Sequence, residues 1–337
     1  MKLLPALCFT ATLLAQSWAP QAGNTRTSLR GVSAIDARTV FASGSGGTWL
    51  ATTDGGVTWK AATVPGAEAL DFRGIRAVDA RTVYLMSAGV GDKSRIYKTT
   101  DAGEHWTLLY TNPDPKGFFD AIAFWDAQHG MVVGDQLEDR AEILTTDDGG
   151  ATWQHRSSPP ALPNEGSFAA SNTCVALLGM RDAWFVTGGP GATRVFHSKD
   201  RGRTWTVATT PIRNDGPSAG IFSLAFADAR HGIAVGGDYS KDKEDRQNVA
   251  LTSDGGRTWS APASPGPKGF RSAVAGLPGR KLWVATGSSG SDASADGGKS
   301  WKLFDSGAYN AMSFVAGGDG WAVGPQGRIA RFVPPAN

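Results

Sequence analysis

Short apolar segments joined by tight turns make up most of this chain. In one recurring arrangement, an apolar segment is followed by an Asp-Ala turn and then by a second apolar segment, as at Gly31–Ile35, Asp36–Arg38 and Val40–Ser43. Similar Asp-Ala turns stand at residues 79–80, 126–127 and 228–229. Apolar runs of this length, bounded by turn residues, are typical of β-strands. The pattern therefore predicts an all-β protein.

An eight-residue motif, Thr/Ser-x-Asp-x-Gly-x-x-Trp, interrupts the strands at regular intervals. Its six copies span Thr52–Trp59, Thr99–Trp106, Thr146–Trp153, Ser198–Trp205, Thr252–Trp259 and Ser294–Trp301. Their tryptophans follow one another after 47, 47, 52, 54 and 42 residues. Self-similarity at such a period is the signature of a repeat architecture.

The residue types of the motif suit a hairpin turn. An Asp side chain can accept hydrogen bonds from the N–H groups of its own turn, and Gly adopts a positive φ without strain. The closing Trp then packs its ring against neighbouring strands. A calcium loop is the alternative, but calcium needs more oxygen ligands than each copy offers. We therefore predict structural roles for Asp54, Asp101, Asp148, Asp200, Asp254 and Asp296, and for Trp59, Trp106, Trp153, Trp205, Trp259 and Trp301.

Repeats of about 45 residues that each hold four short strands are typical of propeller blades. Six units end in the motif, and a last segment, Tyr309–Phe332, holds three more strands but no fourth. The segment Trp18–Pro20 resembles the outer-strand sequence Trp259–Pro262. We therefore predict a seven-bladed β-propeller of four-stranded blades, closed by the N-terminal strand. Such closure would leave no sheet edge open.

The first residues have the character of an export signal. Lys2 precedes the apolar run Leu3–Ala15, which is too short to span a bilayer and is followed by small residues. We predict a signal peptide at residues 1–17 and a single propeller domain at residues 18–337. The mature protein is then expected in the periplasm or outside the cell, with no membrane span and with Cys174 as a buried, inert thiol.

Composition excludes several other classes of protein. The chain has 337 residues, with 33 Lys and Arg against 31 Asp and Glu, so that it lacks the basic surface of a nucleic-acid-binding protein. Two cysteines cannot form a disulfide scaffold, and the five histidines lack metal-ligand spacing. No Gly-x-Gly-x-x-Gly opens a helix, as a dinucleotide site would require. We expect a monomer with no cofactor and no metal.

The eight-residue motif resembles the Asp-box, or BNR repeat, of sialidases, family 74 glycosidases, sortilin-type receptors and photosystem II assembly-factor propellers. Across about 310 residues, the chain is most similar to the last group and its bacterial relatives, because size, export signal, seven units and N-terminal closure all agree. The resemblance implies peripheral, structural Asp-boxes. It also implies a non-enzymatic scaffold that binds a protein or peptide, as an assembly or stability factor does.

The topology of a blade indicates which face carries function. Because the inner strand starts at the face opposite the Asp-box turn, inner-strand starts should surround one mouth of the channel. The aligned units place there Arg30, Arg73, Asp120, Asn172, Phe222, Arg271 and Asn310. Three arginines would suit a carboxylate, sulfate or phosphate, although channel mouths are often simply polar. The charged loops Asp135–Arg140 and Asp238–Arg246 and the long connections Ser157–Ser171 and Pro211–Gly220 should widen this face.

A glycoside hydrolase is the alternative function. A sialidase would need an arginine triad, an acid and a Tyr–Glu pair, for which the chain offers Arg30, Arg73, Arg271, Asp71, Tyr309 and Glu165. The sequence Phe72-Arg73-Gly74-Ile75 differs from the sialidase motif Phe-Arg-Ile-Pro, and sialidase propellers have six blades. A family 74 enzyme would need two opposed carboxylates, for which Asp120 and Asp238 are available. We assign no catalytic residue and expect a binding protein.

Overall fold

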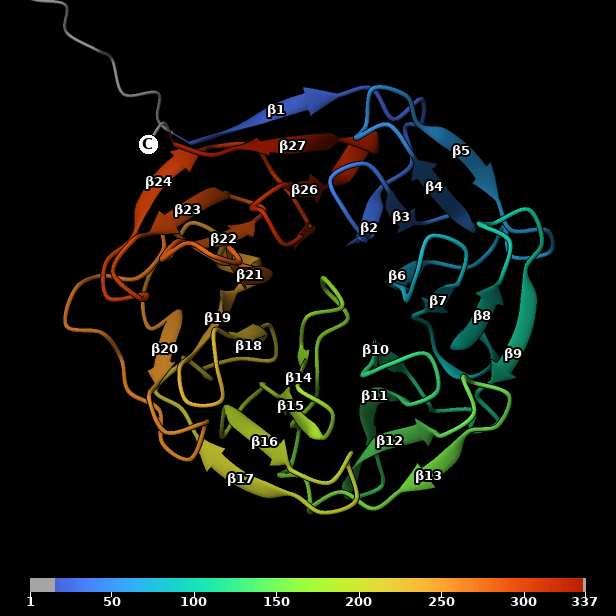
Figure 1. Cartoon of the computed structure of the whole chain (residues 1–337). Coiled ribbons are helices and arrows are strands. Elements are labelled where there is room, and N and C mark those ends of the chain that lie inside the picture. The colour runs from blue at the N-terminus through green and yellow to red at the C-terminus, as the bar shows by residue number, and fades with distance from the viewer. Residues whose placement is uncertain (1–15, 336–337) are drawn as a thin grey trace, which may run out of the picture.

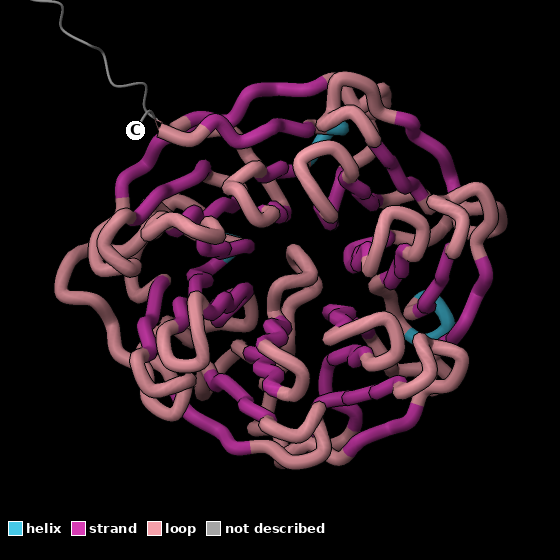
Figure 2. Tube along the Cα trace, viewed as in Figure 1, coloured by secondary structure: helices cyan, strands magenta, loops and turns pink. Residues whose placement is uncertain are grey.

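The computed structural model describes residues 16–335, which form a ring of seven β-sheets around a central channel (Figure 1). Strands joined by short loops dominate this part of the chain, and the helices within it are three short 3-10 turns (Figure 2). The predicted all-β, seven-bladed propeller is confirmed. The predicted signal peptide falls outside the described residues except for Gln16 and Ser17, and it stays a prediction.

The blades follow one another in chain order. Blade 1 comprises β2 (Leu29–Ala34), β3 (Val40–Gly44), β4 (Thr48–Thr52) and β5 (Lys60–Thr63). Blade 2 comprises β6 (Phe72–Ala77), β7 (Val83–Ser87), β8 (Arg95–Thr99) and β9 (Thr107–Thr111), with η1 (Gly91–Lys93) between β7 and β8. Blade 3 comprises β10 (Phe119–Phe124), β11 (Gly130–Leu137), β12 (Arg140–Thr146) and β13 (Gln154–Arg156).

The remaining blades repeat the same antiparallel order. Blade 4 comprises β14 (Val175–Leu178), β15 (Asp182–Val186), β16 (Arg194–Ser198) and β17 (Thr206–Thr209). Blade 5 comprises β18 (Ala219–Phe226), β19 (Gly232–Asp238) and β20 (Val249–Thr252), with η2 (Tyr239–Lys241) after β19. Blade 6 comprises β21 (Ala273–Gly276), β22 (Trp283–Gly287), β23 (Gly290–Ser294) and β24 (Lys302–Asp305). Blade 7 comprises β25 (Ala311–Phe314), β26 (Gly320–Val323), β27 (Ile329–Val333) and β1 (Ser17–Gln21), with η3 (Pro325–Gly327) before β27.

The two ends of the described chain close the ring together. Strand β1 pairs antiparallel with β27, with Trp18 opposite Phe332, and the two strands lie side by side in Figure 1. The Trp18 ring is 5% exposed, and its Nε1 donates a hydrogen bond of 3.0 Å to Ser291 of blade 6. The N-terminal strand therefore completes blade 7 and also contacts its neighbour, as the sequence predicts.

Blade 5 departs from the predicted four strands. Its outer position is held by a single bridge between Ser260 and Leu251, which exchange two backbone hydrogen bonds of 2.8 and 3.0 Å. Pro262 and Pro265 follow Ser260 and have no N–H group to donate to a ladder. The outer strand of this blade therefore stops after one pair.

Each Asp-box forms one turn stabilised by two side chains. In the box of blade 5, the Thr252 hydroxyl accepts the buried N–H of Gly256 at 2.9 Å. The Asp254 carboxylate accepts the N–H of Thr258 at 3.0 Å and its hydroxyl at 2.7 Å. Gly256 has a φ of 88°, which favours glycine. The Thr/Ser at the first position of the motif therefore binds the buried N–H, whereas the Asp binds an exposed one.

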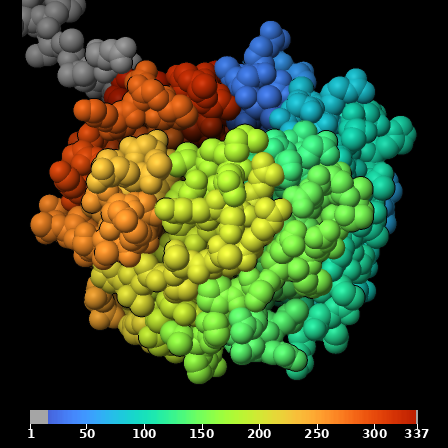
Figure 3. Space-filling view, turned by 60° about the horizontal axis from the view of Figure 1, so that its bottom comes forward, coloured from blue at the N-terminus to red at the C-terminus, as the bar shows by residue number. Residues whose placement is uncertain are grey.

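Apolar side chains of neighbouring blades form the core. One buried cluster joins blades 3, 4 and 5 through Met131, Phe185 and Ile221. Asp-box tryptophans extend this packing, and the Trp205 ring meets Phe185 edge-on at a centroid distance of 4.9 Å. Blades pack closely around the ring, in chain order, on the side shown in Figure 3. The ring therefore provides a rigid frame for the loops at the channel.

Candidate functional site

A shared backbone irregularity turns four side chains toward the channel. The pairing of the inner strand with the second strand shifts register at Arg30, Arg73, Asp120 and Phe222. A β-bulge inserts one unpaired residue and re-aims its side chain. These four residues are the ones that the aligned units predict at the inner-strand starts of blades 1, 2, 3 and 5. The bulge explains why their side chains leave the blade.

The bulged residues line a cavity of about 470 Å³ at one mouth of the channel, which we call the mouth cavity. Its wall consists of Arg30, Arg73, Phe118, Asp120, Asp135, Ser167, Phe168, Ala169, Ala170, Phe222, Tyr239, Phe270, Ser272, Ser288 and Asn310. They come from inner-strand starts, from ends of second strands and from the connection before β14. The Asp-boxes join third to fourth strands and therefore lie at the other end of the blades.

The segment Ser167–Thr173 crosses the channel and forms the floor of the mouth cavity. In Figure 1 the chain before β14 reaches toward the centre of the ring. Ser171 donates to the carbonyl of Ser272 in blade 6, and Thr173 donates at 2.7 Å to Ser223 in blade 5. Residues 167–170 line the mouth cavity, whereas residues 171–173 line a second cavity of about 310 Å³. We call Ser167–Thr173 the plug segment.

Asn172 fixes the plug segment to blades 2 and 3. Its side-chain carbonyl accepts the N–H of Ile122 at 2.8 Å, and its amide donates to the carbonyls of Ile122 and Ile75 at 3.0 and 3.3 Å. Its φ of 65° is one that Asn tolerates better than most residues. The expectation of Asn172 at the mouth is corrected, since it lines the second cavity.

Two arginines lie side by side on one wall of the mouth cavity. Arg73 donates to the Asp71 carboxylate at 2.7 Å and to the carbonyl of Ala169 at 3.3 Å. Arg30 donates to the same carbonyl at 3.4 Å, and its Nε has no hydrogen-bond partner among the described residues. Burial and the neighbouring Arg73 charge lower the pKa of Arg30, against the opposite effect of Asp71. One anionic group facing Arg30 and Arg73 would relieve this repulsion.

Two carboxyl groups from blade 3 line the same cavity. Asp120 is 1% exposed, and neither of its oxygens has a hydrogen-bond partner among the described residues. Asp135, on the neighbouring strand β11, accepts the N–H of Ser167 at 3.0 Å. Burial raises the pKa of Asp135 to about 6. Burial, and next the charge of Asp135, raise the pKa of Asp120 well above its usual range.

Aromatic rings from blade 5, blade 6 and the plug segment form a further wall. The Phe168 and Phe222 rings stack at a centroid distance of 3.9 Å, and Phe270 meets Phe222 edge-on at 4.6 Å. Gly188 and Gly220 make room for Phe168, because a Cβ on either would lie 2.7 or 2.8 Å from its ring. Tyr239 closes the group and is 55% exposed. The cavity thus combines cationic, acidic and aromatic walls.

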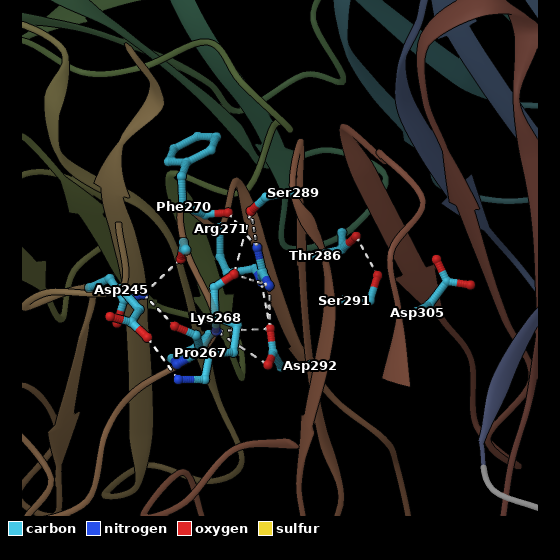
Figure 4. Close-up of polar contacts among 12 residues, drawn as sticks. Asp245, Pro267, Lys268, Phe270, Arg271, Thr286, Ser289, Ser291, Asp292 and Asp305 are labelled. Carbon is cyan, nitrogen blue, oxygen red and sulfur yellow. Dashed lines mark hydrogen bonds and ion pairs between the residues drawn. The ribbon is translucent and has the colours of Figure 1, made fainter. Parts of the chain in front are cut away.

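Arg271 does not line the cavity, which corrects the expectation of a third mouth arginine. Its side chain is fully buried, and Nε donates to Asp292 at 2.8 Å (Figure 4). Its other nitrogens donate to Ser289 and to the carbonyls of Phe270 and Lys268. In blade 6 the strand β21 starts two residues later and has no bulge at this position. Arg271 is therefore held inside the blade.

Asn310 reaches the cavity by a different route. It stands directly before β25 and lines the cavity. Its side-chain amide donates at 2.7 Å to the carbonyl of Leu29 in blade 1. Asn310 thus connects blades 7 and 1 and exposes part of its surface to the mouth.

The residue sets weighed for a hydrolase are not assembled. Glu165 pairs with Arg194, and Tyr309 is 4% exposed with its ring 5.6 Å from that of Trp18. Asp238 accepts the N–H of Ser240 at 2.9 Å and lies 3.7 Å from Arg213. None of these groups is part of the cavity wall. The sialidase set and the pair of Asp120 with Asp238 are therefore not brought together.

Sequence reasoning missed several residues of the cavity. Phe118 and Phe270 stand one or two positions before the predicted inner-strand starts, and Asp135 opens a charged loop that we expected to widen this face, without a role for Asp135 itself. Phe168 belongs to the long connection Ser157–Ser171, whose length was its one visible signal. This connection folds inward because its residues contact blades 1, 2, 3, 5 and 6. A single sequence does not show such contacts.

Among residues 16–335, no group of three or more His, Cys, Asp and Glu side chains is arranged to hold a metal ion. The repeated His129 and His231 each lie 2.9 Å from an aspartate of their own Asp-Ala turn, Asp126 and Asp228. No helix within this range is long and apolar enough to cross a membrane. Cys174 is a buried free cysteine, and burial raises the pKa of its thiol.

Fold and repeat together define an Asp-box β-propeller with a ligand-sized cavity at the channel mouth. Residues 112–221 match the family model described as photosynthesis system II assembly factor YCF48. A curated relative, the photosystem II assembly lipoprotein Ycf48 of Synechococcus sp. (strain CC9902), is 31% identical over 140 residues. This match covers 42% of the chain and 35% of the relative, about a third of its length. The resemblance to the photosystem II assembly-factor propellers is thereby confirmed.

Solved structures agree with the fold. The structure described as YCF48 bound to D1 peptide superposes with a TM-score of 0.62 at 16% identity, covering 98% of this chain and 99% of that one. The WD40 β-propeller domain of Doa1 superposes with a TM-score of 0.61 at 14% identity, covering 94% and 97%. Similarity at such low identity shows the fold alone.

Proposed function

We propose that this chain is an exported, non-enzymatic propeller that binds a peptide segment of a protein partner in the mouth cavity, as an assembly or stability factor does. The observation that carries the proposal is the cavity wall itself. Arg30 and Arg73 offer N–H donors beside an aromatic surface of Phe168, Phe222 and Phe270. A peptide offers both of the complementary groups, a carboxylate and apolar side chains.

The comparisons support a peptide-binding role. The segment that matches the assembly-factor family model, residues 112–221, includes Asp120, Asp135 and the whole plug segment. A relative of the same family has been solved with a peptide bound. A rigid ring that presents one shaped mouth suits a scaffold that recognises a protein segment.

Export is part of the proposal. The apolar run Leu3–Ala15 after Lys2 favours a signal peptide, and the curated relative is described as a lipoprotein. We infer that the propeller acts in the periplasm or outside the cell. Cys8 follows Leu7 inside the apolar run, which is a poor context for lipid attachment.

Hydrolysis remains the second candidate, because Asp120 and Asp135 place one buried and one half-buried carboxyl group in the same cavity. Glycosidases set their two carboxyls on opposite sides of the scissile bond. Here the carboxyls come from adjacent strands of one blade, β10 and β11. This origin favours a joint binding site over two flanking catalytic groups.

A display library of random peptides, together with the D1 peptide, tests the proposal. Peptides that bind the wild-type protein are measured again on the double variant Arg30→Gln/Arg73→Gln. We expect affinity to fall at least tenfold, because charge-assisted hydrogen bonds are lost. The matched control is Arg38→Gln/Arg81→Gln, which removes two arginines of the same blades that donate to the Asp-box carbonyls of Thr53 and Thr100.

The control variant should bind like the wild type, and circular dichroism should show all variants folded. The proposal is wrong if no peptide is enriched, or if the enriched peptides bind the mouth variant and the wild type equally well. Turnover of chromogenic glycosides by the wild type, lost in Asp120→Asn, would instead support the hydrolase.

A further inference from the structure

The Asp120 carboxyl is an exception among the buried acids of this protein. The described residues contain five buried carboxylates, Asp120, Glu142, Glu165, Asp238 and Asp292. The other four accept a hydrogen bond or pair with an arginine, such as Asp292 with Arg271 in Figure 4. Neither oxygen of Asp120 has a hydrogen-bond partner among the described residues, although the backbone N–H of Ala169 favours its ionised form. A buried polar group without a partner is costly, so a native structure that keeps one suggests a missing ligand.

Among the described residues, no cationic side chain donates a hydrogen bond to Asp120. Arg73 is the positive charge that acts on the pKa of Asp120, but its Nε is held by Asp71 at 2.7 Å and its Nη1 by the carbonyl of Ala169. The other ionisable groups around Asp120 are Asp135 and Glu142, both acidic, and the buried Cys174 thiol. The surroundings of Asp120 therefore concentrate acidic groups, against which the Arg73 charge acts without a hydrogen bond to the Asp120 carboxyl.

Asp120 belongs to the wall of the mouth cavity, where its two oxygens are buried. It lines the mouth cavity together with Asp135, which uses Oδ1 for the N–H of Ser167. The aromatic rings of Phe168, Phe222 and Phe270 line the same cavity. Such rings accommodate the apolar stem of a long cationic side chain and attract its charged end.

We propose that Asp120 and Asp135 form an acidic subsite of the mouth cavity that binds the ammonium group of a lysine side chain in the peptide ligand. The inference rests on the proposed peptide-binding function and adds the residue type that the peptide must present. An ammonium group has three donors, enough for both oxygens of Asp120 and one of Asp135. The arginine wall then takes an anionic group of the same peptide.

Binding of the cation should displace a proton. Burial and the Asp135 and Glu142 charges raise the pKa of the Asp120 carboxyl, whereas the Arg73 charge lowers it. An ammonium in contact with the carboxylate stabilises the ionised form and lowers this pKa. Proton release on binding, at a pH where the free carboxyl is protonated, is therefore an expected signature of the subsite.

The probe for the subsite is n-butylammonium, which carries the stem and charge of a lysine side chain, with n-butanol as the neutral control. Carboxyl ¹³C NMR of the wild-type protein should show saturable shifts at Asp120 and a lower Asp120 pKa with butylammonium only. Butylammonium should also shift the Asp135 carboxyl signal, and this shift should disappear in Asp120→Asn and persist in Asp139→Asn, a variant of an exposed acid of the same blade.

A second measurement uses peptides from the library that contain lysine. On the wild-type protein, the peptide with norleucine in place of lysine should bind at least tenfold more weakly than the lysine peptide. On Asp120→Asn, the two peptides should bind with equal affinity. The Arg30→Gln/Arg73→Gln variant should keep the preference for lysine while it loses affinity for both peptides.

These outcomes separate the two proposals. If butylammonium binds at Asp120 but no peptide is enriched, the subsite stands and the peptide-binding function fails. If peptides bind through the arginines with no preference for lysine, and butylammonium causes no shift at Asp120, the acidic subsite is overturned and the peptide-binding function stands.

Discussion

At the residue scale, Asp120 shows how a side chain can be placed for binding at the expense of stability. Its position at an inner-strand start could be predicted from the repeat. Its lack of hydrogen-bond partners could not be predicted. It arises because Arg73 donates to Asp71 and to the carbonyl of Ala169 instead of to Asp120. The same reasoning placed Arg271 at the mouth, and there the carboxylate of Asp292 holds the arginine inside its blade. At such inner-strand starts, one hydrogen-bond partner therefore decides whether the side chain reaches the mouth cavity or stays inside its blade.

The Asp120→Asn variant should be more stable than the wild type at pH 8. Because the folded-state pKa of Asp120 is raised, the carboxyl favours folding at low pH, and this contribution is lost as pH rises above the unfolded value of about 4. We expect a gain of about 1–3 kcal/mol at pH 8 and a smaller one at pH 5. Urea unfolding at both pH values measures it. Asp139→Asn should change neither value, and a pH-independent effect of Asp120→Asn would contradict the argument.

At the element scale, the Asp-box turn and the inner-strand bulge differ in how well sequence reveals them. The turn was predictable because each copy carries its own acceptor and its own glycine. The bulge has no such signal, since Arg30 and Arg73 are followed by glycine but Asp120 is followed by Ala121. The plug segment was visible only as a long connection, because its hydrogen bonds reach residues up to 139 positions away.

Within the Asp-box, Thr252 should matter more for stability than Asp254. Thr252→Val keeps the shape of the side chain but leaves the buried N–H of Gly256 unpaired, at a cost of about 1–3 kcal/mol. Asp254→Ala should cost less, because the N–H of Thr258 is exposed and can bind water. Urea unfolding compares the two variants, with Thr252→Ser as the control that keeps the hydroxyl. A Thr252→Val protein as stable as the wild type would show that the hydroxyl has no such role.

At the scale of the whole molecule, the number of blades and the manner of closure could be predicted because they follow from counting. Six motifs, one incomplete unit and a matching N-terminal segment leave one arrangement without an open sheet edge. The shape of the mouth cavity could not be predicted from the number of repeats. It results from seven blades of unequal inner-strand length and from one connection that folds into the channel.

Closure by β1 should contribute a large part of the stability of the ring. Trp18 packs among Phe304, Tyr309, Phe314 and Phe332 and donates to Ser291, so that its side chain joins blades 6 and 7. Trp18→Ala should therefore cost about 3–5 kcal/mol, and Trp18→Phe clearly less. Trp301→Ala is the matched control, since its ring is only partly buried and donates its one hydrogen bond to the carbonyl of Gly298 in its own turn. Urea unfolding that ranks Trp301→Ala as the more damaging change would mean that the ring is not held together at this seam.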